Sequence, residues 1–127
     1  REDWDFAAAN GIRIIPIAEF HARGADDVMA EARDIVGAGP VYVTYDIDFV
    51  DPTFAPGTGT PEVGGPNSWQ ALQVARGLRG LDVVGADLVE VSPPFDASGG
   101  TAWLGISLMF EMLCVMAERV AGQRAQG

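Results

Sequence analysis

The chain has 127 residues, enough for one modest domain with a hydrophobic core. Hydrophobic residues make up 48% and charged residues 20%, a composition typical of globular rather than disordered proteins. The net charge is -10 with only 8 Lys and Arg residues, which argues against nucleic acid as a partner because basic side chains hold a phosphate backbone. A small cation or a metal ion would suit this negative field, although acidity more often serves solubility alone.

The single cysteine, Cys114, excludes an internal disulfide and fits a reducing compartment, so we expect a cytoplasmic protein. It lies in an apolar run, where a buried and inert thiol is the expected state. We identify no run of about 18 apolar residues of the kind that crosses a membrane, so no membrane partner is expected. The chain begins at Arg1, without Met and within a predicted helix, and we therefore expect an N-terminal segment to be missing.

The first part of the chain is predicted to alternate helix and strand. Residues 3–10 are typical of the end of a helix that stops at Gly11, because glycine is favoured just after helices. The β-branched run Ile12–Ile17 predicts a strand. Residues 25–36 place apolar side chains on one face and predict an amphipathic helix that stops at Gly37.

A second strand and a long loop occupy the middle of the chain. Residues 41–45 predict the strand, and residues 51–67 contain much of the proline and glycine. Loops of this length in a compact domain are usually functional. Ser68 is a suitable N-cap for a helix that runs to Arg76.

The last part of the chain is predicted to hold a third strand and a long helix. The strand lies within residues 81–91, and Ser92-Pro93-Pro94 ends it. Residues 101–120 predict a long apolar helix that is buried on more than one side. Residues 122–127 form a polar tail that we expect to fray.

This order of elements predicts an α/β fold with a three-layer arrangement, in which a parallel sheet has flanking helices and right-handed crossovers. No repeat, low-complexity tract or linker divides the chain. Three strands and so apolar a final helix indicate a surface that continues into another part of a protein.

Asp46 and Asp48 are the first candidates for chemistry. If both belong to the strand that precedes them, their carboxylates point the same way because alternate strand residues share a face. The carboxyl end of a parallel strand borders the crevice where α/β proteins bind ligands. Two such charges need a cation or protons nearby, and oxygen ligands suit divalent ions such as Mg or Mn. Asp-x-Asp alone is a weak signal.

The loop that follows strengthens this prediction. Its glycines permit tight turns and its prolines fix φ, so the loop can form a rigid wall beside a metal centre. Without the aspartates, an ordinary surface loop rich in proline and glycine would be the better interpretation. The acidic pair Asp87 and Glu90, at the end of the third strand, is a further candidate.

These segments resemble the ureohydrolase (arginase/agmatinase) family. The family pattern is Ser/Thr-x-Asp-x-Asp-x-x-Asp-Pro, followed by Pro-Gly/Ala-Thr-Gly-Thr-Pro-x-x-Gly-Gly. This chain has Thr44-Tyr-Asp46-Ile-Asp48-Phe-Val-Asp51-Pro52 and then Pro56-Gly57-Thr58-Gly59-Thr60-Pro61-Glu-Val-Gly64-Gly65. Gly85-Ala-Asp87-Leu-Val-Glu90-Val-Ser-Pro93 is a second match at the family's distance. The likeness extends through essentially the whole chain.

The resemblance implies a binuclear Mn(II) site whose metals activate a water molecule that attacks a guanidinium carbon and releases urea. In that family Asp46 matches the aspartate that bridges both ions, and Asp48 matches one that binds a single ion. Glu90 matches the carboxylate that pairs with the substrate guanidinium, which makes it both catalytic and substrate-binding. Asp87 would be a supporting acid near Glu90. Asp51 is expected to shape the loop rather than bind metal.

The chain also departs from the family. The family's remaining ligands come from a Gly-Gly-Asp-His stretch and an Asp-Ala-His-x-Asp stretch, both N-terminal to this region, and a proton-shuttling histidine also lies upstream. Neither stretch is present, and the only histidine, His21, matches none of these positions. We interpret His21 as a surface or packing residue. Residues 1–127 are therefore expected to be the C-terminal half of a ureohydrolase domain, without its N-terminal half and inactive alone.

The substrate and the alternatives stay open. The Ala55–Thr60 segment is closer to agmatinases than to arginases, whereas Ser92–Asp96 and Gly99–Thr101 are similar to guanidino-acid hydrolases such as guanidinobutyrase. Agmatine is the first choice and a guanidino acid the second; trimers or hexamers are implied by the resemblance. A non-catalytic truncated subunit or pseudoenzyme is the alternative, which a start codon directly before Arg1 would favour. An Asp-x-Asp sugar-nucleotide transferase would need a phosphate-binding glycine loop, which we do not find.

Overall fold

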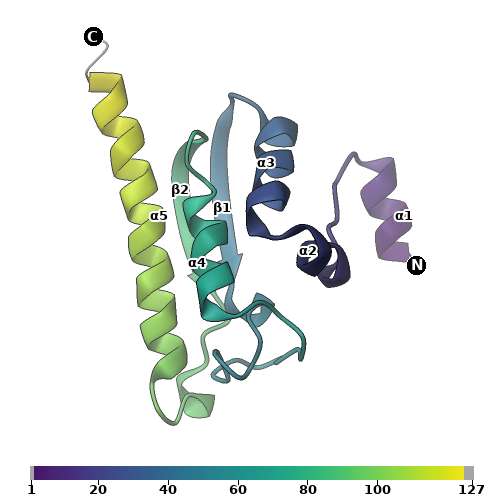
Figure 1. Cartoon of the computed structure of the whole chain (residues 1–127), viewed down its shortest axis with the longest axis vertical. Helices are drawn as coiled ribbons and strands as arrows, with labels where there is room; N and C mark the ends of the chain where they lie inside the picture. The colour runs from purple at the N-terminus through teal and green to yellow at the C-terminus, as the bar shows by residue number, and fades with distance from the viewer. Residues whose placement is uncertain (1, 125–127) are drawn as a thin grey trace.

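The computed structural model describes residues 2–124 and shows helices packed around a parallel sheet (Figure 1). Helix α4 packs against both α3 and α5, and α5 also packs against β2. This arrangement confirms the predicted α/β class. In chain order the elements are α1 (Glu2–Ala9), α2 (Ile17–Arg23), α3 (Ala25–Val36), β1 (Pro40–Asp46), the 3-10 turn η1 (Ile47–Phe49), α4 (Ser68–Arg76), β2 (Asp82–Val89), the 3-10 turn η2 (Pro93–Phe95) and α5 (Gly100–Arg124).

Strands β1 and β2 run parallel, so their carboxyl ends lie at the same edge of the sheet. Thr44 pairs with Asp87 in the ladder, and Asp46 pairs with Val89. The two strands predicted for this part of the chain are thus confirmed. Their shared carboxyl edge is where an open α/β sheet binds ligands.

The strand predicted for Ile12–Ile17 is wrong. Within residues 2–124 the sheet consists of β1 and β2 alone, and Ile17 already begins α2. Pro16 stands at the N-cap of this helix, where the missing N–H of proline costs nothing. Glu19 and Arg23 form an ion pair at 2.7 Å with helical i,i+4 spacing. These helix signals outweigh the β-branched residues.

Helices α3 and α4 follow the predicted bounds, with one difference at the start of α4. Asn67, one residue before Ser68, is the N-cap: its side chain accepts the Gln70 N–H at 2.9 Å. The Gln70 side chain in turn accepts the Asn67 N–H at 3.0 Å. This reciprocal capping box satisfies two backbone donors that would otherwise have no partner.

The main core lies between the sheet and the helices α4 and α5. Ala71 and Ala75 of α4 are fully buried in this core. The Tyr45 hydroxyl donates to the Ala71 carbonyl at 3.1 Å, and burial raises the pKa of this phenol. Val83 of β2 and Leu108 of α5 are buried in the same core.

Helix α5 confirms the predicted long helix and extends it, but the prediction of burial on more than one side is wrong. Its inner stripe packs on the sheet, while large apolar side chains point away from it along the whole outer side. The buried stripe is Leu104, Leu108, Met112 and Val115, and the exposed side chains include Trp103, Ile106, Phe110 and Leu113. Cys114 is half-buried. Of the tail expected to fray, residues 122–124 are helical, and the remainder lies outside the described residues.

Residues 100–122 of α5 are long and apolar enough to cross a membrane by length and composition, so the expectation that no such run exists is also wrong. A helix that covers a sheet passes the same test. Helix α5 is such a helix, because it packs on β2 and α4.

Candidate metal centre

Asp46 and Asp48 lie together at the carboxyl end of β1. Asp46 is the last residue of the strand, and Asp48 belongs to the 3-10 turn η1. The expectation that both occupy one strand is therefore wrong, and a turn brings the two carboxylates together instead. The Asp48 N–H donates to Asp46 Oδ1 at 2.9 Å, and both side chains line one cavity.

Two threonines of the following loop hold the Asp48 carboxylate. The hydroxyl of Thr58 donates to Oδ1 and that of Thr60 donates to Oδ2. Thr58 is itself buried. Carboxylates that bind metal ions typically accept such hydrogen bonds, which fix their orientation. The sequence motif contains both threonines, but we did not predict this role; their spacing on either side of Gly59 is the signal that could have shown it.

Asp51 folds the loop back onto this turn. Its Oδ1 accepts the Thr53 N–H and its Oδ2 accepts the Gly64 N–H, each at 2.8 Å. Hydrogen bonds from Thr53 and then from Gly64 lower the pKa of the Asp51 carboxyl. A Cβ on Gly65 would lie 2.5 Å from the Asp51 nitrogen, so only glycine fits there. Asp51 thus joins residues 53 and 64 of the loop, and its role in shaping the loop rather than binding metal stays a prediction.

The middle of the loop is held by the start of α5 and by the segment that precedes it. The Gly57 N–H donates to Thr101 Oγ1 at 2.8 Å, and the Ser92 N–H donates to the Gly57 carbonyl at 2.7 Å. Asp96 accepts the N–H groups of Thr101 and Ala102 at 3.1 and 2.9 Å. The bond from Ala102 is the main cause of the lowered pKa of the Asp96 carboxyl. The loop is therefore an ordered part of the site.

The aspartates open into a cavity of about 460 Å³. Its wall contains a third carboxylate, Glu62, together with apolar side chains and the two glycines that end the motif. The lining residues are Ile17, Asp46, Asp48, Phe49, Glu62, Val63, Gly64 and Gly65. A lining with three carboxylates and several apolar side chains suits a small cationic ligand with an aliphatic part.

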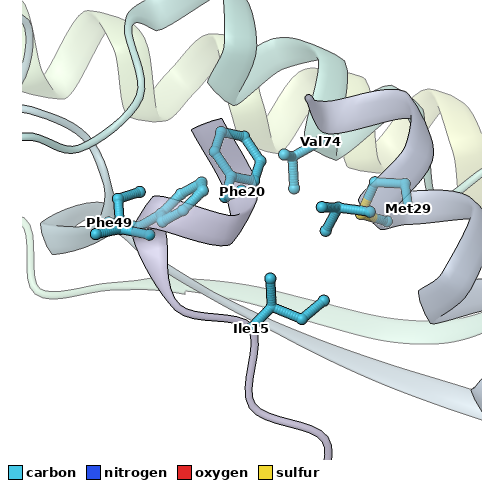
Figure 2. A pocket seen from close by; sticks show the side chains of 7 residues that line it. Ile15, Phe20, Met29, Phe49 and Val74 are labelled. Atoms are coloured by element: carbon cyan, nitrogen blue, oxygen red, sulfur yellow. The ribbon is translucent and has the colours of Figure 1, made fainter. Parts of the chain in front are cut away.

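A smaller apolar cavity of about 190 Å³ adjoins the first and shares Ile17 and Phe49 with it. Figure 2 shows Phe20 and Phe49 on one side of this cavity and Met29 on the other, with Ile15 below. Phe20 and Phe49 meet edge to face, with ring centroids 5.4 Å apart. Phe20 of α2 thus packs directly on the turn that carries Asp48.

The acidic pair at the end of β2 is divided. Asp87 faces β1, where the hydroxyls of Tyr42 and Thr44 donate to its carboxylate and lower its pKa, Thr44 more strongly. Glu90 follows the last residue of β2, next to the strand end that bears Asp46, and is exposed. Its φ of 65° lies in the left-handed region, which few non-glycine residues adopt and which is enriched at functional sites. It does not line the cavity described above.

The side chains at the cavity show whether this part of the chain could bind a metal ion. Two carboxylates with oriented oxygens are hard ligands that suit Mn(II). Among residues 2–124, however, no group of three or more His, Cys, Asp or Glu side chains is placed to hold an ion. Asp46 and Asp48 have the chemistry to supply part of the ligand set of such an ion, and a complete site would need further ligands.

Comparison with known protein families matches residues 1–114 to the arginase family. The chain belongs to the arginase family. The match covers both aspartates, the loop, and the segment with Glu90. It confirms the family that the sequence motifs indicated.

Relatives in the arginase family include enzymes for several guanidino compounds. The chain is 59% identical over 120 residues to a guanidinopropionase from Pseudomonas aeruginosa, a match that covers 94% of the chain and 38% of the relative. It is 50% identical over 115 residues to a guanidinobutyrase from the same species, covering 91% of the chain and 36% of the relative. The chain therefore spans less than two fifths of these relatives.

Solved structures show the same fold. A hypothetical agmatinase from Burkholderia thailandensis superposes with a TM-score of 0.85 at 46% identity, covering 88% of the chain and 36% of that structure. The proclavaminate amidino hydrolase of Streptomyces clavuligerus gives a TM-score of 0.86 at 42% identity, covering 89% and 38%. The chain thus has the arginase fold over most of its length.

Proposed function

We propose that this chain forms part of a manganese-dependent enzyme that hydrolyses a guanidino compound to urea and an amine. The observation that carries the proposal is the cavity lined by Asp46 and Asp48, with Asp48 oriented by two threonine hydroxyls. Family membership supports the same chemistry. We propose a cytoplasmic location with no nucleic-acid or membrane partner.

In this proposal Asp46 and Asp48 hold the manganese. The metals would lower the pKa of a water molecule and stabilise negative charge in the transition state. Glu90 would receive the guanidinium group through charge-assisted hydrogen bonds, for which its oxygens have no partner among the described residues. Asp87 would support the strand end rather than touch the substrate, because its carboxylate is already bound by hydroxyls of β1.

The remaining ligands would come from a part of the protein beyond this chain. Within the described residues each of the two strands has one edge without a strand neighbour, and such an edge presents unpaired backbone groups to which another strand can bind. The exposed apolar side of α5 also calls for a cover. We therefore propose that residues 1–127 are the C-terminal half of the domain and are inactive alone. The complete protein would form a homo-oligomer, a trimer or hexamer.

Two substrate classes remain candidates. Agmatine is favoured by the Ala55–Thr60 segment. A short guanidino acid is favoured by the names of the two Pseudomonas relatives described above. Both classes share the guanidinium that Glu90 would bind, but they differ in the length of the aliphatic chain and in its terminal group, an ammonium in agmatine and a carboxylate in a guanidino acid.

The test is urea release by the complete ureohydrolase domain that contains this chain, loaded with manganese. Agmatine, 3-guanidinopropionate and 4-guanidinobutyrate are supplied separately at equal concentration. We expect urea from at least one of them and none from residues 1–127 alone. Absence of urea from all three would reject the proposed function and favour a non-catalytic subunit.

A further inference from the structure

The wall of the aspartate cavity is held from outside the metal motif by His21. Its Nε2 lies 2.7 Å from the carbonyl oxygen of Gly64, which lines the cavity. In the part of the chain that the structure describes, His21 is the only side chain outside residues 46–67 that hydrogen-bonds residues 62–66. The lone histidine is therefore exposed, as expected, but connected to the site.

Helix α2 is fixed so that His21 faces this wall. Phe20 is buried and packs edge to face on Phe49, which belongs to the same turn as Asp48. Ion pairs of Glu19 and Arg23 tie α2 to Arg13 and α3; one joins Arg23 to Asp27 at 2.6 Å. Two further ion pairs join Arg13 to Glu19 and Arg23 to Glu31.

A different side of α2, which bears Ile17 and His21, lies at the cavity. Ile17 and His21 are four residues apart, so they lie one above the other on the helix surface. Ile17 lines the cavity, and His21 reaches the carbonyl of Gly64 beside it. A helix outside the metal motif thus contributes both surface and support to the site.

The hydrogen bond matters because the Gly64–Gly65 peptide has little intrinsic rigidity. Gly64 has a φ of 94°, and glycine populates many backbone conformations at similar energy. Asp51 holds the N–H of Gly64, whereas the carbonyl is held by His21. Without His21 the Gly64 carbonyl loses this partner, so Gly64 and the adjoining wall residues Glu62 and Val63 are less restrained.

We infer that His21 is a positioning residue, which holds the Gly64 carbonyl and thereby fixes the cavity wall against which the aliphatic part of a guanidino substrate packs. The inference rests on the proposed function for the identity of the ligand. It places the effect of His21 on substrate binding. The Asp48 carboxylate has its own supports in Thr58 and Thr60.

The kinetic test compares His21→Ala, His21→Gln and Arg33→Ala in the complete domain. The Gln side chain can still donate to the Gly64 carbonyl. Arg33→Ala is the matched control: it removes a helix side chain that donates to a distant glycine carbonyl, Gly77 at 2.6 Å, away from the cavity. We expect His21→Ala to raise KM about 3- to 10-fold, the size of one lost hydrogen bond, with kcat and manganese content unchanged. His21→Gln should restore most of KM, and Arg33→Ala should leave it unaltered.

Amide hydrogen exchange of residues 62–65 gives a second readout that needs no enzyme activity. These amides should exchange faster in His21→Ala than in the wild type or in Arg33→Ala. Unchanged exchange, or an active His21→Ala enzyme with wild-type KM, would overturn the inference. A fall in kcat with lost manganese would also overturn it, because His21 would then act on the metal site. A wild type that releases no urea rejects the proposed function instead, while the exchange experiment still tests the hydrogen bond.

Discussion

The loop 51–66 is held by more contacts than its composition indicates, whereas helix α5 is less buried than its composition indicates. The loop is rich in proline and glycine, yet its backbone is held by Asp51, Thr101 and His21. Helix α5 has the composition of a buried helix, yet Phe110 is 63% exposed and Trp103 is 71% exposed. The order of a segment depends on its partners: those of the loop lie within this chain, whereas the outer side of α5 has none among the described residues.

The largest expected effect concerns Glu90, which has no hydrogen-bond partner among the described residues, unlike the carboxylates that the loop holds. In the complete domain, Glu90→Ala should lower kcat/KM on the order of 100-fold, because a charge-assisted contact to the guanidinium is lost. The manganese content should not change. Steady-state urea release and metal analysis on the same sample measure both. Wild-type turnover in this variant would remove Glu90 from the site.

Two leucines of α5 test the difference between its inner and outer sides. Leu108 is fully buried, and Leu113 is 61% exposed. Leu108→Ala should lower the free energy of unfolding by about 2–5 kcal/mol. Leu113→Ala should change it by no more than about 0.5 kcal/mol if nothing covers the outer side. Denaturant unfolding measures the effect of each substitution, once in residues 1–127 and once in the complete domain. A large effect of Leu113→Ala only in the complete domain would show that another part of the protein covers α5.

Gly65 tests whether the loop is as tightly packed as its hydrogen bonds indicate. A methyl group there meets the backbone of residues 49–51, which cannot move as a flexible side chain would. Gly65→Ala should destabilise the protein by about 1–3 kcal/mol. Gly39→Ala is the matched control, because its Cβ would meet nothing within 4 Å. Equal melting temperatures for the two variants would contradict a packed loop.

The smallest expected effect is a dependence of stability on pH through Asp96, which joins the loop to α5. Hydrogen bonds, first from Ala102, lower its pKa in the folded state. The stabilisation is therefore present above the unfolded pKa of about 3.9 and is lost as pH falls through the lower folded value. Asp96→Asn should reduce the loss of stability between about pH 5 and pH 3. An acid unfolding curve parallel to that of the wild type would exclude this contribution.

The sequence predicted most of what local signals determine. Glycine after Val36 marks the end of α3, and the motif identifies Asp46 and Asp48 as a pair. It did not predict that Asp48 lies on a 3-10 turn, because alternation along a strand would also bring the two carboxylates together. Contacts distant in sequence were also missed, such as His21 with Gly64, since the pattern around either residue contains no sign of the other.

The outer side of α5 was misjudged for a related reason. An apolar helix predicts burial, but the sequence does not show whether the covering surface belongs to the same segment. The run Ile12–Ile17 was misjudged because β-branched residues were weighed above Pro16 and the Glu19–Arg23 spacing. Local patterns therefore predicted Asp46 and Asp48 as candidate ligands but did not predict the tertiary contacts around them.

The most direct test of the account is the manganese content of the complete ureohydrolase domain and its Asp46→Ala and Asp48→Ala variants, measured by elemental analysis after dialysis. Asp34→Ala, which removes an exposed carboxylate away from the cavity, controls for the loss of charge. We expect a binuclear complement in the wild type and in Asp34→Ala, and loss of metal and urea release together in the other two. Unchanged manganese in Asp46→Ala would contradict the assignment of this cavity as part of a metal site.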